Sequence, residues 1–106
     1  MASSEENELN EREVAVLETL HADPLNAGYN SYTLVERLHP KVTSASKDER
    51  TKTYNEAGEI TAKLIKLGSV RGDLKKDAIG AVYFADLRLT ASGEQKLITH
   101  QMYSHQ

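Results

Sequence analysis

The stretch LIKLGSV at residues 64–70 is the point where the hydrophobic pattern of this chain changes its period. Before it, apolar residues recur three and four positions apart, which is the spacing of one face of an α-helix. After Gly68, apolar and polar residues alternate, as they do in a half-buried strand. Glycine also commonly follows the last turn of a helix. The stretch therefore predicts a helix that ends at Leu67 and a strand that starts directly afterwards.

The helix before this stretch is the longest regular element that the sequence predicts. We expect it to begin between Asp48 and Lys52, after a loop over residues 41–46. Its predicted buried stripe consists of Tyr54, Ala57, Ile60, Leu64 and Leu67. Its opposite face carries Lys52, Asn55, Glu56, Glu59, Lys63 and Lys66. This pattern predicts a helix with one side against the core and the other in solvent.

Two shorter helices are predicted nearer the N-terminus. Asn10 and Glu13 have the spacing of a capping box, so the first helix starts directly after Asn10. The second is expected over about residues 31–38, because Pro40 disfavours helical backbone at the residue before it. All three helices precede the change of period at Gly68.

A hairpin and a last helix are predicted after Gly68. The strands cover about residues 69–74 and 81–89, joined by a turn over 75–80. Strict alternation places one set of second-strand residues toward the core, namely Ala81, Tyr83, Ala85, Leu87 and Leu89. It places the other set away from the core, namely Val82, Phe84, Asp86 and Arg88. Thr90 then caps a helix over about residues 91–103, and Gly93 allows its first turn to approach a neighbouring backbone.

The predicted fold class is α+β, mainly α, in one domain over residues 10–103. Residues 1–9 are expected to form a disordered acidic leader, and residues 104–106 a frayed tail. A single aliphatic core is expected, made of Leu17, Leu20, Leu34, Val35, Leu38, Ile60, Leu64, Leu67, Leu87 and Leu97.

Two strings resemble winged helix-turn-helix domains of the MarR-like and PadR-like regulators. LIKLGSV resembles the end of a recognition helix, and LRLTASGEQKLI at residues 87–98 resembles the exit from the wing. The resemblance implies three helices, a β-hairpin wing and a C-terminal helix. It also implies that the third helix reads the major groove of double-stranded DNA while the wing contacts the DNA backbone. The connection over residues 39–50 is longer than these folds usually have, and the terminal helices are shorter than the dimerising helices of MarR-like proteins.

The composition excludes several classes of protein. The chain has no cysteine, which excludes disulfides, thiolate metal sites and a cysteine nucleophile. No apolar run approaches the roughly 20 residues that span a bilayer, and the first residues, MASSEENELNERE, are acidic and unlike a signal peptide. A cytoplasmic protein without membrane contact is therefore expected.

Catalytic and metal-binding motifs are absent from the sequence pattern. The four histidines, at positions 21, 39, 100 and 105, do not have the spacing of helical zinc ligands. The pattern KKDAIG contains one glycine and is not a phosphate-binding loop. We expect no enzyme activity, no metal and no cofactor.

Charge is distributed unevenly along the chain. The net charge is −3, and residues 1–13 carry five Glu against one Arg. Residues 37–76, in contrast, carry ten Lys or Arg against five Asp or Glu. The basic part coincides with the predicted third helix and the hairpin, where a DNA-binding protein would contact phosphates.

The predicted DNA-binding residues lie on the third helix and around the hairpin turn. On the helix, we expect Lys47, Arg50 and Lys52 to neutralise phosphates, and Thr53 and Asn55 to contact bases. On the hairpin, we expect Arg71, Lys75 and Lys76 to contact the DNA backbone, with the two lysines bracketing the turn.

A protein-binding module without DNA binding is the alternative. Val82 and Phe84 would then form an apolar patch for another protein. The overall acidity and the two glutamates of the third helix, Glu56 and Glu59, favour this interpretation. For the DNA-binding protein we expect a homodimer that is weak in isolation and favoured on DNA, through the terminal helix with Leu97, Ile98, Met102 and Tyr103 or through the first helix around Val16. The alternative is a monomer in which these residues close the core.

Overall fold

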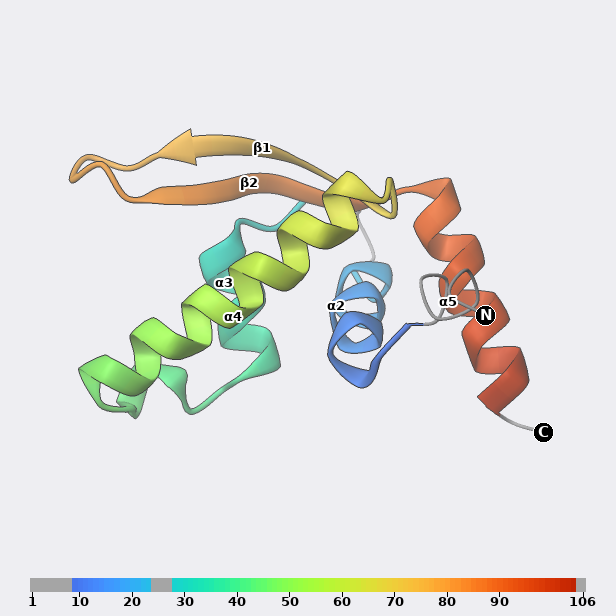
Figure 1. The fold of residues 1–106 in the computed structure, drawn as a ribbon, viewed down its shortest axis with the longest axis horizontal. Helices are drawn as coiled ribbons and strands as arrows, with labels where there is room; N and C mark the ends of the chain where they lie inside the picture. Colours follow the sequence, from blue (N-terminus) through green and yellow to red (C-terminus); the bar gives the residue numbers. More distant parts are fainter. Residues whose placement is uncertain (1–8, 24–27, 105–106) are drawn as a thin grey trace.

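The computed structural model describes residues 9–23 and 28–104. Their fold is mainly α with one antiparallel hairpin, as predicted (Figure 1). The elements are α2 (Glu11–His21), α3 (Ser31–Leu38), the 3-10 turn η1 (Val42–Ser44), α4 (Lys47–Lys66), β1 (Val70–Lys76), β2 (Val82–Leu89) and α5 (Ala91–Ser104). The expected leader lies outside the described residues except for Leu9, and so does the expected tail except for Ser104, which ends α5.

The elements are arranged with the hairpin along one side of the helices. The hairpin runs past α3 and α4, with its tip at one end of the molecule (Figure 1). At the other end, α5 contacts α2 and projects beyond it. The end of α4, both strands and the start of α5 therefore meet near the base of the hairpin.

Side-chain caps fix the starts of the first three helices, and the sequence predicted the first of these caps. Asn10 Oδ1 accepts the Glu13 N–H at 2.8 Å, and the Glu13 carboxylate accepts the Asn10 N–H at 3.0 Å, which completes the capping box. Asn30 caps α3 through the Thr33 N–H at 2.7 Å. The predicted start of α4, between Asp48 and Lys52, was one to five residues late, because Ser46 caps the helix and Lys47 is already helical.

The main core is aliphatic and draws on every helix. Leu17, Leu34, Leu64, Leu87 and Leu97 are each at most 1% exposed. Leu38 and Ile60 are partly buried against them. Val35 was placed wrongly in this core, since it lies in a second cluster with Val42 and Ala57.

Leu67 was also predicted wrongly as a core residue, since it is 44% exposed. The buried face of α4 consists of Ala57, Thr61 and Leu64, and Leu67 follows at the end of the helix. The chain reverses at Gly68, which has a φ of 80°, and inserts Val70 into the core. Val70 is therefore buried in the core, whereas Leu67 is not.

A β-bulge changes the predicted faces of β2. Arg71 pairs with Arg88 and Asp73 pairs with Ala85, so β2 has one more residue than β1 in this interval. Asp86 in the interval has a φ of 57°, a left-handed conformation found in bulges. Because the alternation shifts there, Phe84 and Leu87 both reach the core, and the prediction that Phe84 points away was wrong.

The hairpin is longer than predicted, and a third segment pairs with it. β1 continues through Lys75 and Lys76, so the lysines belong to the strand and the turn begins at Asp77.

Next to the bulge, Tyr29 exchanges two backbone hydrogen bonds with Leu87, at 3.1 and 2.7 Å. This bridge joins the start of α3 to the sheet.

Thr90 joins the four chain segments that meet at the base of the hairpin. Its hydroxyl donates to the Gly68 carbonyl at 2.6 Å and accepts the Gly93 N–H at 3.0 Å, which caps α5 as predicted. Its own N–H donates to the Ser69 carbonyl at 3.1 Å. Gly93 is buried directly over Ser69, where a Cβ would collide with the Ser69 carbonyl oxygen. We call this set of contacts the Thr90 junction.

The first prediction tests the Thr90 junction. Gly93→Ala adds a methyl group against backbone and should lower the free energy of unfolding by about 1–3 kcal/mol, the usual cost of overpacking. Ser92→Ala, on an exposed position of the same turn, is the control and should change stability by less than about 0.5 kcal/mol. Urea unfolding measures both. Equal stability of the two variants would contradict the close approach at Gly93.

Candidate functional site

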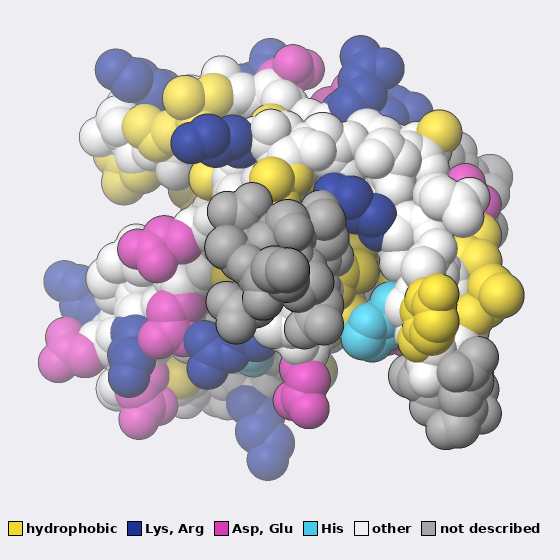
Figure 2. Space-filling view, turned by 45° about the vertical axis from the view of Figure 1, so that its right-hand side comes forward, with side chains coloured by type: hydrophobic (Ala, Val, Ile, Leu, Met, Phe, Trp, Pro, Cys, Tyr) yellow, Lys and Arg dark blue, Asp and Glu magenta, His cyan; other side chains and the backbone are white. Residues whose placement is uncertain are grey.

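A groove lies between the first half of α4, the start of α3 and the outer end of β2. Its volume is about 540 Å³. Figure 2 shows the hollow on its left side, below the hairpin and above the charged end of α4. Its walls include Ser31 and Tyr32 of α3, the residues Lys47, Arg50, Thr51, Tyr54, Asn55 and Gly58 of α4, and residues 81–84.

The groove carries positive charge and hydrogen-bonding groups. Lys47 and Arg50 are exposed on its α4 wall, and no Asp or Glu belongs to the described residues that line it. Thr51 and Asn55 add a hydroxyl and an amide on the same wall. An amide side chain can donate and accept at once, which is the chemistry that reads an adenine edge.

Three tyrosines form the aromatic part of the groove. The ring of Tyr32 lies 5.7 Å from that of Tyr54 in an edge-to-face arrangement and 5.4 Å from that of Tyr83. These rings come from α3, α4 and β2, so their contacts join the three walls of the groove. This cluster could not be foreseen from the sequence, because the two contacting pairs are 22 and 51 positions apart and no local pattern relates them.

Tyr32 also connects α3 to the turn of the hairpin. Its hydroxyl donates to Asp77 Oδ2 at 3.4 Å. Partial burial, and then the negative charge of Asp77, raise the pKa of Tyr32 above its ordinary value of 10.0. The neutral phenol is therefore the form that this contact stabilises.

The structure brings three of the eight predicted DNA-binding residues into the groove: Lys47, Arg50 and Asn55. Lys52 and Thr53 do not line it, and the Thr53 hydroxyl donates to the Glu49 carbonyl at 2.8 Å. A helix turns by 100° per residue, so neighbours along α4 cannot all share one face.

The three predicted residues of the hairpin are divided between its two ends. Arg71 lies near the base, opposite Arg88, in a separate hollow beside Ile65 and Thr90. Lys75 and Lys76 are exposed at the outer end of β1 and pair with Tyr83 and Val82 of the groove wall. Neither lysine lines the groove. Because neighbouring strand residues point to opposite faces of the hairpin, only Lys75, which pairs with Tyr83, shares the face of the tyrosine cluster.

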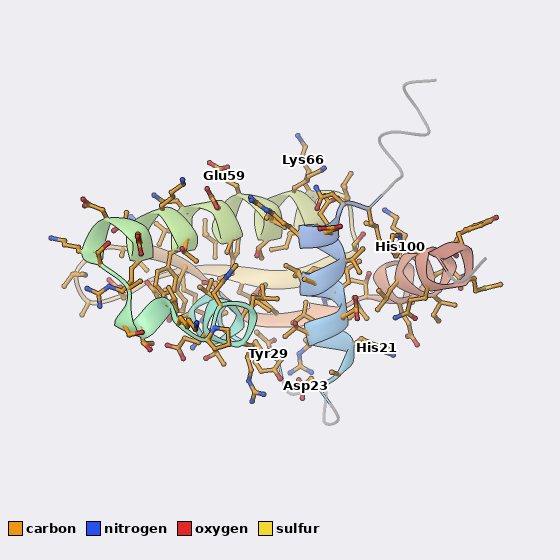
Figure 3. All side chains as sticks on the ribbon, turned by 90° about the horizontal axis from the view of Figure 1, so that it is seen from below. His21, Asp23, Tyr29, Glu59, Lys66 and His100 are labelled. Carbon is orange, nitrogen blue, oxygen red and sulfur yellow. The ribbon has the colours of Figure 1, made fainter. Side chains whose placement is uncertain are left out.

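The carboxylates of α4 lie outside the groove lining. Glu56 forms an ion pair with Arg12 at 3.6 Å, in the space between α2, α3 and α4. Glu59 points away from the body of the molecule, on the same side of α4 as Lys66 (Figure 3). Asp48 and Glu49 belong to the first turn, where carboxylates interact favourably with the helix dipole.

One basic residue of α4, Lys63, forms an ion pair within the protein. Lys63 forms an ion pair with Glu13 at 2.9 Å, and the Glu13 side chain is only 3% exposed. Since Glu13 also completes the α2 capping box, this pair fastens α4 to α2. Lys63 therefore has a structural partner, while Lys47 and Arg50 face the groove.

Exposed apolar side chains gather on α5 and on the hairpin. On α5 these are Ile98, Met102 and Tyr103, whereas Leu97 is 1% exposed. Val16 is also 1% exposed. The predictions of subunit contacts through Leu97 and Val16 were therefore wrong, because both side chains fill the protein's own core.

Comparison with protein-family models, with curated proteins and with solved structures gave no match to this chain. Among residues 9–23 and 28–104, no three His, Asp or Glu side chains lie together as a metal site would need. No helix in this part of the chain is long and apolar enough to cross a membrane.

The second prediction concerns pH. The folded protein raises the pKa of Tyr32, so the neutral phenol stabilises the folded state at neutral pH. This contribution to the free energy of unfolding is lost as the pH rises above 10, through the raised pKa. Wild-type stability should therefore fall over this range by more than that of Tyr32→Phe, which has no phenol to ionise. Tyr103→Phe, on the exposed face of α5, should follow the wild type. Parallel pH curves for wild type and Tyr32→Phe would contradict the assignment.

Proposed function

We propose that the protein is a winged-helix DNA-binding protein and a transcriptional regulator, with α4 as its recognition helix and the β1–β2 hairpin as its wing. The observation that carries the proposal is the groove between these two elements. It presents Lys47 and Arg50 on one wall, and no carboxylate is among its described lining residues. Lys75 and Lys76 lie on the strand that pairs with another wall. Such a surface matches the charge of a phosphate backbone.

The arrangement of elements supports the fold part of the proposal. Three helices precede a hairpin that follows α4 directly, and a further helix follows the hairpin. The Tyr29–Leu87 bridge adds a third segment to the sheet, and this segment directly precedes α3 in the sequence. A small sheet that carries a hairpin beside the third helix is the arrangement that the sequence resemblance implies.

In this proposal, the first half of α4 enters the major groove of DNA. An α-helix fits that groove, and its N-terminal residues are the ones that reach base edges. Asn55 would contact a base while Lys47 and Arg50 neutralise phosphates at the groove border. Lys75 and Lys76 would contact the backbone from the wing. The tyrosine contacts hold α3, α4 and the wing at a fixed spacing, so that both elements can contact the duplex together.

Protein binding is the second candidate function. The observation that favours it is the exposure of Leu74, Ile79 and Val82 on the hairpin. Phe84 contributes less than the sequence implied, because it packs against the core. The dependence of affinity on salt concentration distinguishes the two functions. Phosphate contacts make affinity fall steeply as salt increases, whereas the affinity of an apolar interface changes little.

The third prediction tests the groove. The double variant Lys47→Glu/Arg50→Glu should weaken binding to a short mixed-sequence duplex and reduce the salt slope by about one unit for each phosphate that the protein no longer neutralises. The double variant Lys52→Glu/Lys66→Glu makes the same change of charge at two exposed α4 side chains that do not line the groove, and it should have a smaller effect. Fluorescence anisotropy over a series of salt concentrations measures both. Equal effects of the two reversals, or none, would overturn the groove as the binding surface.

Charge reversals outside the groove should weaken DNA binding less than those within it. Lys52→Glu and Arg71→Glu should weaken binding less than reversal at position 47 or 50, because neither side chain lines the groove. Circular dichroism checks that each variant is folded.

We also propose that two copies bind DNA together. One winged helix covers few base pairs, and two copies on neighbouring half-sites give greater selectivity. The exposed Ile98, Met102 and Tyr103 of α5 offer an apolar surface for this contact. Because the surface is small, the dimer should be weak without DNA and favoured on it.

The fourth prediction tests this assembly by sedimentation at increasing concentration, with and without duplex. Wild type should be largely monomeric alone and dimeric on DNA. Met102→Glu should bind as a monomer. Ser92→Glu adds the same charge about 15 Å away along the helix and should behave as wild type. A strict monomer on the duplex would contradict the dimer and would favour the protein-binding function.

A further inference from the structure

The tip of the hairpin presents one bulky apolar side chain. Ile79 is 89% exposed, more than any other large hydrophobic residue that the structure describes. Ala78 and Gly80 beside it are small, so the tip is narrow. An aliphatic side chain in water gains none of the free energy of burial. Ile79 therefore contributes little to the stability of the fold and is available to a partner.

A hydrogen-bond network holds this tip in one conformation. Asp77 Oδ1 accepts the N–H groups of Ile79 and Ala81, each at 3.0 Å. The Asp77 N–H donates to the Ala81 carbonyl at 2.9 Å, and the Gly80 N–H donates to the Asp77 carbonyl at 3.0 Å. The other carboxylate oxygen accepts the hydroxyl of Tyr32, which joins the turn to α3. Ile79 is thus presented by an ordered turn, which lowers the entropy cost of binding.

The charges around the tip favour an anionic partner. Lys75 and Lys76 are exposed directly before the turn. Asp77 is the acid of the turn, and both of its carboxylate oxygens are already hydrogen-bonded within the protein. Asp77 keeps its charge in these hydrogen bonds, so residues 75–81 carry a net charge of +1. The tip therefore combines a narrow apolar point with a net positive charge. The minor groove of DNA is complementary to this combination, with phosphates along its edges and stacked bases at its floor.

We infer that Ile79 enters the minor groove of the bound duplex and wedges between two base pairs, while Lys75 and Lys76 contact the flanking phosphates. The inference rests on the proposed DNA-binding function and deepens it. Apolar wedges of this kind partly unstack a base step and kink the duplex by about 20–90° toward the major groove. Pyrimidine–purine steps such as TA are the easiest to unstack, so the wedge selects duplexes by their deformability.

The test uses a duplex of mixed sequence with a central TA step. 2-Aminopurine replaces the adenine of that step and reports unstacking, and a pair of fluorophores on the ends reports bending. The variant is Ile79→Ala. The control is Leu74→Ala, which removes a 66% exposed leucine from the hairpin outside the turn. A duplex with a stiff A-tract in place of the TA step measures the preference for deformability.

Wild type and Leu74→Ala should raise the 2-aminopurine fluorescence, shorten the distance between the ends and prefer the TA duplex by about tenfold. Ile79→Ala should still bind the duplex through the groove. It should neither kink the duplex nor unstack its TA step, and it should not prefer the TA duplex to the A-tract duplex. If wild type binds without a kink, or Ile79→Ala kinks the duplex as wild type does, the wedge is overturned while the proposed function stands.

Two other outcomes overturn the wedge in different ways. Failure of wild type to bind any duplex overturns the proposed function together with the wedge. Binding of wild type to vesicles of phosphatidylserine and phosphatidylcholine, abolished in Ile79→Ala and without any kink in DNA, assigns the tip to an anionic membrane surface instead.

Discussion

The contact on which the rest of the structure depends is the hydrogen bonding of Thr90 at the base of the hairpin. Its hydroxyl lies between the Gly68 carbonyl and the Gly93 amide, and its backbone N–H reaches the Ser69 carbonyl. This one residue fixes where α4 ends, how the two strands leave the helices and where α5 begins. Because the base of the hairpin is fixed there and its tip is bonded to Tyr32, the hairpin is held alongside α4. The groove is the space that this arrangement leaves between them.

The distribution of charge in space is compatible with the proposed binding of an anionic ligand by an acidic chain. The net charge of −3 describes the whole sequence, but a ligand responds to the local field. In the folded chain, Glu13 is nearly buried against Lys63, and Glu56 faces Arg12. The groove keeps the charges of Lys47 and Arg50 with no carboxylate among its described lining residues. The glutamates that favoured a protein-binding function thus have partners or positions away from this surface.

Local signals in the sequence predicted the fold well, because the interactions behind them are local. The capping box of α2, the reversal at Gly68 and the Thr90 cap each depend on residues a few positions apart. The site was harder to predict, because it depends on how whole elements rotate and shift against each other. The bulge at Asp86 reverses the faces of β2 halfway along the strand, which alternation cannot foresee. The rotation of α4 decides that position 50 lines the groove and position 52 does not, and the tyrosine cluster depends on contacts between three distant elements.

The most direct test of the central claim is an NMR titration of the whole chain with a pool of short mixed-sequence duplexes. If the groove binds DNA, amide chemical shifts should change along it, in the first half of α4, at the start of α3 and in the outer half of the hairpin. Amides at the C-terminal end of α4, around Lys66, should change least, because that end lies away from the groove. Absence of any change with duplex, or changes restricted to residues outside the groove, would contradict the claim that this groove binds DNA.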